Sequence, residues 1–172
     1  VGIVAKKRIG PSWMIGASAY YGYSDGDMTR GVMMADGSTQ FATSSPSTHT
    51  FGARARASYD IDLGQSYLRP LMDFDAIFTH TPGYSEHGAT GLNLAFDSTD
   101  DWTFGITPGL EIGARLPFEG GIARPFATAA VTQWFANDLT MATRIDGSAG
   151  SGFNTTYELG DTVGHISAGV EF

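Results

Sequence analysis

The 172-residue sequence has no cysteine, few basic residues and no long apolar run. Without cysteine, disulfide frameworks, thiolate zinc sites and cysteine nucleophiles are excluded. Ten Lys and Arg against 18 Asp and Glu give a formal net charge of −8. No basic stripe offers a footprint for phosphate backbones, so nucleic acid is excluded as a partner. No run of about 18 apolar residues occurs, which excludes a transmembrane helix.

Small and aromatic residues take the place of the missing charge. Charged residues make up 16% of the chain, below the roughly 25% typical of soluble domains, while the apolar fraction is 42%. At this length we expect one domain, residues 1–172. The sequence begins Val1-Gly2-Ile3-Val4, without Met or a signal-peptide pattern. This favours a domain that is incomplete at its N-terminal side and begins inside a longer protein.

Apolar and polar residues alternate with a period of two along most of the chain, which predicts an all-β fold. Over 13–24, the odd positions are apolar or aromatic and the even positions are mostly small or polar. Between Thr50 and Leu63 every charged residue falls on an even position. The same segregation recurs in the ranges 67–80, 102–116, 123–135, 139–146 and 163–172.

The polar face consists of Gly, Ser, Thr and scattered Arg and Asp, whereas a soluble β-sandwich is covered with Lys and Glu. This favours an inside-out arrangement, with the apolar face in lipid and the polar face lining the interior. Such a sheet must close, because open edges do not occur in hydrocarbon. From Trp13 to Tyr23 the chain spans roughly 25 Å at a tilt of about 40°, which is the height of the apolar band. We therefore expect a transmembrane, antiparallel, up-and-down β-barrel.

Gly64-Gln65 suits a two-residue type II′ hairpin turn, because that turn favours glycine at its first central position. Facing positions in the hairpin then sum to 129, and all charged pairs fall on the polar face. The predicted pairs are Arg54 with Asp75, Arg56 with Asp73, and Asp60 with Arg69.

Nine strand-like segments are expected, and their connections differ in length. The connections are 10–12, 25–47, 64–65, 81–85, 98–101, 117–121, 136–138 and 147–162. Every second connection is the longer one, as in outer-membrane barrels with short periplasmic turns and longer external loops, so we expect a periplasmic C-terminus. Bacterial barrels have even strand numbers. Either residues 1–9 are not a strand, or upstream strands are missing, and we favour missing strands.

Five short motifs occur in order along nearly the whole chain. They are Tyr67-Leu68-Arg69-Pro70, Tyr84-Ser85-Glu86-His87-Gly88-Ala89, Thr107-Pro108-Gly109-Leu110, Arg124-Pro125-Phe126 and Ser167-Ala168-Gly169-Val170-Glu171-Phe172. Their order and spacing resemble the C-terminal part of an autotransporter translocator domain, the β-barrel of type V secretion. The resemblance implies a bacterial outer-membrane barrel of about twelve strands, of which this chain supplies the last eight or nine.

The resemblance also implies a function and a set of partners. The domain would anchor an N-terminal passenger in the outer membrane and help to export it to the cell surface. Its partners would be outer-membrane lipid, the passenger and linker helix upstream of Val1, the barrel assembly machinery and periplasmic chaperones.

Three sets of residues are assigned roles on this basis. The expected lumen-lining residues are Arg54, Arg56, Arg69, Asp73, Asp75, Glu86, Glu111, Arg115, Arg124 and Arg144. The expected aromatic girdle at the membrane interfaces consists of Trp13, Tyr21, Tyr23, Phe51, Tyr59, Phe78 and Trp102. In the terminal strand, Ile166, Ala168, Val170 and Phe172 are similar to the signal that the assembly machinery recognises.

Other functions remain open on the sequence alone. A stand-alone eight-stranded outer-membrane barrel with a structural or adhesive role would use only residues 13–172. An outer-membrane hydrolase would use Asp73, Asp75 and His80. A soluble ligand-binding barrel would need the apolar face to point inward.

Catalytic and metal-binding motifs are weak. His80, Glu86 and His87 lack the spacing of a metal site, and the carboxylates over 97–101 lack the glycine and closing glutamate of a calcium loop. Neither a Gly-x-Ser-x-Gly elbow nor a P-loop occurs. We therefore expect no enzyme activity, no cofactor and no metal.

Overall fold

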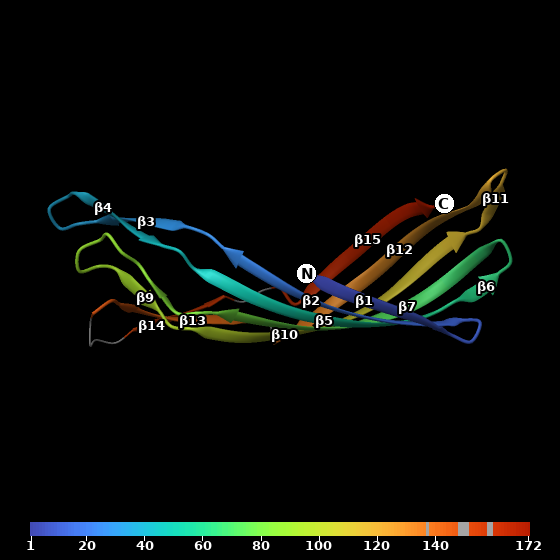
Figure 1. Ribbon diagram of the computed structural model, residues 1–172, viewed down its shortest axis with the longest axis horizontal. Coiled ribbons are helices and arrows are strands. Elements are labelled where there is room, and N and C mark those ends of the chain that lie inside the picture. Colours follow the sequence, from blue (N-terminus) through green and yellow to red (C-terminus); the bar gives the residue numbers. More distant parts are fainter. Residues whose placement is uncertain (137, 148–151, 158–159) are drawn as a thin grey trace.

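Antiparallel strands form almost all of the computed structural model, which describes residues 1–136, 138–147, 152–157 and 160–172. Seven long strands build one sheet, in the spatial order of the sequence. They are β1 (Gly2–Ile9), β2 (Trp13–Asp25), β5 (Ser47–Tyr59), β7 (Ser66–Thr81), β10 (Thr99–Ala114), β12 (Gly121–Phe135) and β15 (Thr162–Glu171). The sheet curls strongly into half a barrel (Figure 1). Among the described residues, no helix is long and apolar enough to cross a membrane.

The two ends of this sheet differ. At one end, which we call the turn end, short connections join the strands, and β6 (Ile61–Leu63) and β11 (Leu116–Phe118) continue β5 and β10. At the other end, the loop end, three long segments connect them. β3 (Met28–Met33) and β4 (Thr39–Ser44) form a hairpin there. Figure 1 shows the turn end on the right and the loop end on the left.

A separate four-stranded sheet at the loop end corrects one expectation. Segments 84–97 and 139–146 do form strands, but they do not join the half-barrel. They contribute β8 (Tyr84–Ser85), β9 (Leu94–Phe96) and β13 (Leu139–Ile145), which pair with β14 (Phe153–Tyr157) in the order β14-β13-β9-β8. Consequently the connection 98–101, expected at the turn end, lies at the loop end, and the connection 117–121, expected at the loop end, lies at the turn end. Within segment 84–97 the alternation of apolar and polar residues breaks near Gly91, where the chain turns and the glycine has a φ of 72°.

The predicted register of the β5–β7 hairpin is confirmed. Arg54 lies opposite Asp75 and Arg56 lies opposite Asp73. Gly64 has a φ of 81°, the positive value that a type II′ turn requires at its first central residue. Immediately before this turn, β6 pairs with β7 in the same register, so facing residues sum to 129 on both sides of the junction between β5 and β6.

The two faces of the sheet carry opposite chemistry. Asp73 is 2% exposed, whereas its neighbour Phe74, on the other face, is 52% exposed. Because the sheet is a single layer, only the side toward which it curls brings side chains from distant strands together. The polar residues therefore line the concave face, and Phe51, Phe74 and Ile112 project from the convex face. This is the sidedness that the alternation predicts.

Aromatic rings packed against glycines accompany the curl. Tyr20 lies over Gly52, Tyr67 over Gly113 and Trp134 over Gly105, and in each case the glycine is directly opposite the ring in the neighbouring strand. A Cβ added to Gly52 would lie 2.1 Å from the Tyr20 ring. Glycine is therefore required at these positions because it lets the ring approach the backbone.

We expect the substitution Gly52→Ala to destabilise the barrel by about 1–3 kcal/mol, because the new methyl group displaces the Tyr20 ring. Urea unfolding of the purified protein in lipid vesicles measures this loss. Gly22→Ala is the matched control, since its added Cβ would approach no atom closer than Thr50 Cβ at 3.9 Å. Removing the ring in Gly52→Ala/Tyr20→Ala should recover most of the loss that is due to the clash. Equal effects of Gly52→Ala and Gly22→Ala would contradict this explanation.

Candidate functional site

Two arginine–aspartate pairs occupy the centre of the concave face. The Arg54 Nε donates to Asp75 Oδ1 at 2.6 Å. Arg56 donates twice to Asp73, with both distances 2.6 Å. The carboxylates are buried while the arginine side chains are about half exposed. Each guanidinium therefore neutralises a carboxylate beneath it and keeps part of its surface open to the concave side.

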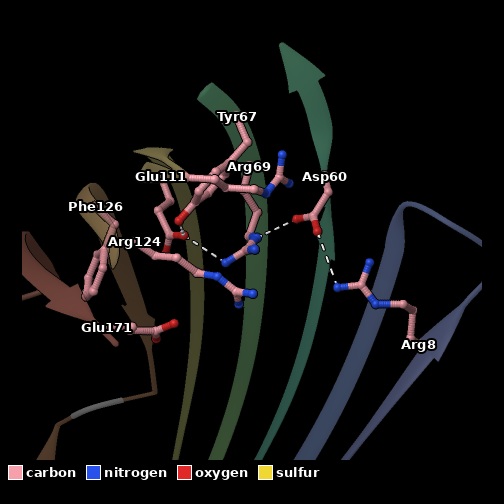
Figure 2. Close-up of a pocket in the computed structure, with 9 residues that line it drawn as sticks. Arg8, Asp60, Tyr67, Arg69, Glu111, Arg124, Phe126 and Glu171 are labelled. Atoms are coloured by element: carbon pink, nitrogen blue, oxygen red, sulfur yellow. Dashed lines mark hydrogen bonds and ion pairs between the residues drawn. The ribbon is translucent and has the colours of Figure 1, made fainter. Parts of the chain in front are cut away.

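A second cluster lies on the same face toward the turn end and crosses several strands (Figure 2). Arg8 of β1 pairs with Asp60 at 3.6 Å, and Asp60 accepts from Arg69 of β7 at 2.5 Å. Arg69 also donates to Glu111 of β10 at 2.7 Å, and the Tyr67 hydroxyl donates to the same oxygen at 2.9 Å. This chain of contacts confirms the predicted Asp60–Arg69 pair.

The second cluster lines a hollow of about 310 Å³. Arg115, Arg124, Phe126 and Glu171 complete its lining. Two guanidinium groups contact the Tyr67 ring, with the Arg69 Cζ 4.9 Å and the Arg115 Cζ 5.3 Å from its centroid. The hollow is therefore lined by charged groups and open toward the concave side, where a polar chain or water can occupy it.

Charge is divided unequally between the sheet and its loop end. The segments 25–47, 82–101 and 136–162 contain 11 of the 18 carboxylates but 2 of the 10 basic residues, a net charge of −9. The remaining strands and turns contain 7 carboxylates and 8 basic residues, a net charge of +1. The concave face is thus nearly balanced, and the negative charge of the chain belongs to the loop end.

Two residues expected in the lumen, Glu86 and Arg144, belong to the loop end instead. Glu86 accepts two hydrogen bonds from Arg30, at 2.9 and 2.5 Å, and Arg144 pairs with Asp97. The correction follows from the separate sheet, because both residues lie in segments that fold beyond the long strands. The other eight predicted residues lie on the half-barrel, and the structure brings all of them to the two clusters or to the hollow.

The Arg30–Glu86 pair fastens the β3–β4 hairpin to segment 84–97. Backbone hydrogen bonds between Thr43 and His87 join the same parts, and Val32, Ala42 and Ala89 form a small buried core between them. Hydrogen bonds from the Arg30 guanidinium lower the pKa of the Glu86 carboxyl below its usual value, and the Leu94 amide contributes to this shift. We call this unit the loop-end cap.

The structure does not bring together the residues that were considered for a hydrolase site or a metal site. Asp75 lies on the concave face and is held by arginine, whereas His80 lies on the convex face of the same strand and pairs with Asp100. Glu86 is bound to Arg30, and the His87 backbone pairs with Thr43, so the trio His80, Glu86 and His87 does not converge. Across the described ranges, no group of three or more His, Asp or Glu side chains is placed to hold a metal ion.

The predicted girdle aromatics form two groups on the convex face. Tyr21, Phe51, Phe78 and Trp102 lie side by side across four strands, with ring centroids 4.9, 6.3 and 5.0 Å apart. Tyr23 follows two residues further toward the loop end. Trp13 and Tyr59 meet near the turn end, with centroids 5.1 Å apart. The two groups bracket the convex apolar surface.

The terminal strand presents its predicted apolar set on the exposed convex side. Ile166 and Phe172 are among the most exposed large apolar residues, Val170 is about half exposed, and Ala168 lies between Ile166 and Val170. The Phe172 ring meets the Phe118 ring edge-on at 6.4 Å. In the part of the chain that is described, β15 pairs with β12 alone, so its other edge is open.

Sequence reasoning missed Arg8 and Tyr67 as members of the concave cluster. The parity of each position contained the signal, because Arg8 pairs with Met14 and Tyr67 faces Gly113, all on the concave face. The sequence therefore predicts that both residues lie on the concave face. The contact between Arg8 of β1 and Asp60 depends on the curl of the sheet and could not be predicted from the sequence.

We expect the loop-end cap to loosen as the pH falls below about 4.3, the unfolded value of a glutamate pKa. The folded pKa of Glu86 is lower than that value, so its stabilising contribution is complete above it and is lost as the pH falls through the folded value. Hydrogen exchange of segment 28–44 between pH 7 and pH 3 measures the loosening.

Glu86→Gln should remove this pH dependence, whereas Asp36→Asn at the tip of the hairpin should retain it. An unchanged acid profile in Glu86→Gln would show that another group is responsible.

Comparison with known proteins assigns the chain to a family. The Autotransporter beta-domain family matches it over residues 1–172, the whole chain. No curated protein matches it. Domains of this family are transport barrels of the outer membrane and are not catalytic. Membership of the family also implies a passenger domain. The curled, antiparallel sheet with its polar concave face fits this assignment: the chain belongs to the autotransporter β-domain family, the outer-membrane translocator of type V secretion.

Proposed function

We propose that the concave face is the wall of the lumen through which this translocator exports its passenger. The observation that carries the proposal is the segregation of the ion pairs, since Asp73 is buried on the concave face while Phe74 is exposed on the convex face. The proposed lumen residues are Arg54, Arg56, Arg69, Asp73, Asp75, Glu111, Arg115 and Arg124. Glu86 and Arg144 are excluded from this set because they pair at the loop end.

The mechanism that we assign to this wall is conduction. An extended or helical peptide that crosses the lumen needs hydrogen-bond partners and water around its backbone. The half-exposed Arg54 and Arg56 offer donors to such a chain, and Asp75 and Asp73 keep the wall close to neutral. A balanced wall holds a polypeptide of either charge weakly, which suits transport better than tight binding.

Closure of the barrel is part of the proposal. Among the described residues, β1 pairs with β2 alone and β15 with β12 alone, so two edges are open. Unpaired backbone groups in hydrocarbon each cost several kcal/mol. We propose that further strands, encoded upstream of Val1, complete an even-numbered barrel of about twelve strands.

We further propose that the turn end and the C-terminus face the periplasm and that the loop end is external. Short turns at one end and long loops at the other support this orientation. The convex aromatic groups would then lie at the two membrane interfaces. The apolar set Ile166, Ala168, Val170 and Phe172, on an open edge strand, would be recognised by the barrel assembly machinery and bound beforehand by periplasmic chaperones.

Reversing the charge of Arg54 and Arg56 to Glu should change the conductance of the pore and reduce passenger display more than it reduces membrane insertion. The substitutions place four carboxylates together on the lumen wall, which repel one another and attract cations. Conductance in planar bilayers and surface labelling of the passenger measure the two effects. Lys7→Glu is the control, because Lys7 lies on the convex face opposite Ile15. Unchanged conductance would contradict the lumen assignment.

The orientation can be tested by cysteine labelling, because the chain contains no native cysteine. Ser38→Cys, at the tip of the β3–β4 hairpin, should react in intact cells with a maleimide that cannot cross the outer membrane. Gln65→Cys, in the β6–β7 turn, should react only after that membrane is permeabilised. The reverse pattern would invert the proposed orientation.

A further inference from the structure

Two histidines lie side by side on the convex face, two residues beyond the aromatic row toward the loop end. His49 of β5 is directly opposite His80 of β7, and the centroids of the two rings are 6.2 Å apart with an interplanar angle of 35°. They are two of the four histidines in the chain. Both lie outside the lumen, so the proposed function does not account for them.

Each imidazole is held by a partner on its Nδ1 atom. His80 Nδ1 lies 2.6 Å from Asp100 Oδ1, and His49 Nδ1 lies 2.8 Å from the Tyr21 hydroxyl. Among the described residues, neither Nε2 atom makes a hydrogen bond within the chain. A histidine that binds a metal usually has its second ring nitrogen bonded to a carboxylate or another acceptor, which fixes the tautomer and orients the ring. His80 has that arrangement with Asp100, and the Tyr21 oxygen can accept in the same way from His49.

The spacing of the rings fits one shared ion. With metal–nitrogen distances of about 2.0–2.1 Å, the centroids of two imidazoles on one ion lie about 5.2–6.4 Å apart as the N–metal–N angle opens from tetrahedral to linear. The observed 6.2 Å falls within this interval. The β5–β7 register places both side chains on the same face of neighbouring strands, so the two rings can reach one ion.

We propose that His49 and His80 form a binding site for one divalent transition-metal ion, with Asp100 and Tyr21 orienting the two rings. Imidazole ligands suit Cu²⁺, Zn²⁺ and Ni²⁺, and Cu²⁺ binds most tightly in this series. Water completes the coordination, because the site faces the solvent side of the aromatic row. A bound ion links β5 to β7 at their loop ends, where the β3–β4 hairpin and segment 84–97 leave the sheet.

From the sequence we expected no metal, because His80, Glu86 and His87, which are close in the chain, lack the spacing of a metal site. The partner of His80 is instead His49, which the β5–β7 register brings opposite it. The proposal is independent of the lumen assignment, because it concerns only the convex face. Failure of one therefore leaves the other intact.

Titration of the purified full-length protein in detergent with Cu²⁺ tests the site by calorimetry and electron paramagnetic resonance. We expect calorimetry to detect one bound Cu²⁺ ion whose affinity depends on both histidines. The electron paramagnetic resonance spectrum should show coupling of this ion to two nitrogen atoms. His49→Gln and His80→Gln should each weaken this binding at least tenfold, and the double variant should abolish it. Asp100→Asn should weaken it about tenfold through loss of ring orientation.

His87→Gln and His165→Gln are matched controls, since these histidines lie elsewhere and should leave the affinity unchanged. Circular dichroism and heat-modified gel mobility verify that each variant is folded. Cu²⁺ binding that survives in the folded double variant, or a wild-type spectrum without coupling to two nitrogens, would overturn the proposal.

Discussion

A single-layer sheet has no second layer to cover either face, and this constraint governs the rest of the molecule. Each face must match the medium that it meets, so apolar and polar side chains separate strictly by parity. Curling then gives the two faces different environments, because it crowds the concave side and spreads the convex side. Asp73 is buried without any covering element, while Phe74 beside it is exposed. The face on which a residue lies, and not its distance from a packed core, therefore determines whether it can be charged.

The sequence allowed parity and register to be predicted, because both depend on local spacing. The alternation assigned the faces, and Gly64-Gln65 fixed the pairing of Arg54 with Asp75. The sheet that each strand joins was harder to predict. Segment 139–146 alternates like a barrel strand and segment 84–97 does so in part, but alternation does not specify which sheet a strand joins. Glu86 was therefore expected in the lumen, whereas the structure places it against Arg30.

The separation of charge gives each part of the chain a different role. The half-barrel contains nearly equal numbers of basic and acidic residues and pairs most of them across strands, so it is almost neutral. The loop-end segments carry a net charge of −9, and their two arginines, Arg30 and Arg144, are both used in ion pairs. These pairs hold loop segments to one another, while those on the concave face join strands. Ion pairs between arginine and a carboxylate thus stabilise both the loop end and the half-barrel.

The rings seated over glycines also discriminate between alternative alignments of the strands. A shift of one residue between β2 and β5 would exchange the two faces, and lipid would oppose it. A shift of two residues would keep every side chain on its proper face, so polarity alone cannot reject it. It would, however, set Tyr20 against Thr50 or Arg54 instead of Gly52, leaving no space for the ring. The positions of the glycines therefore select the correct register between shifts of two residues, which alternating polarity cannot distinguish.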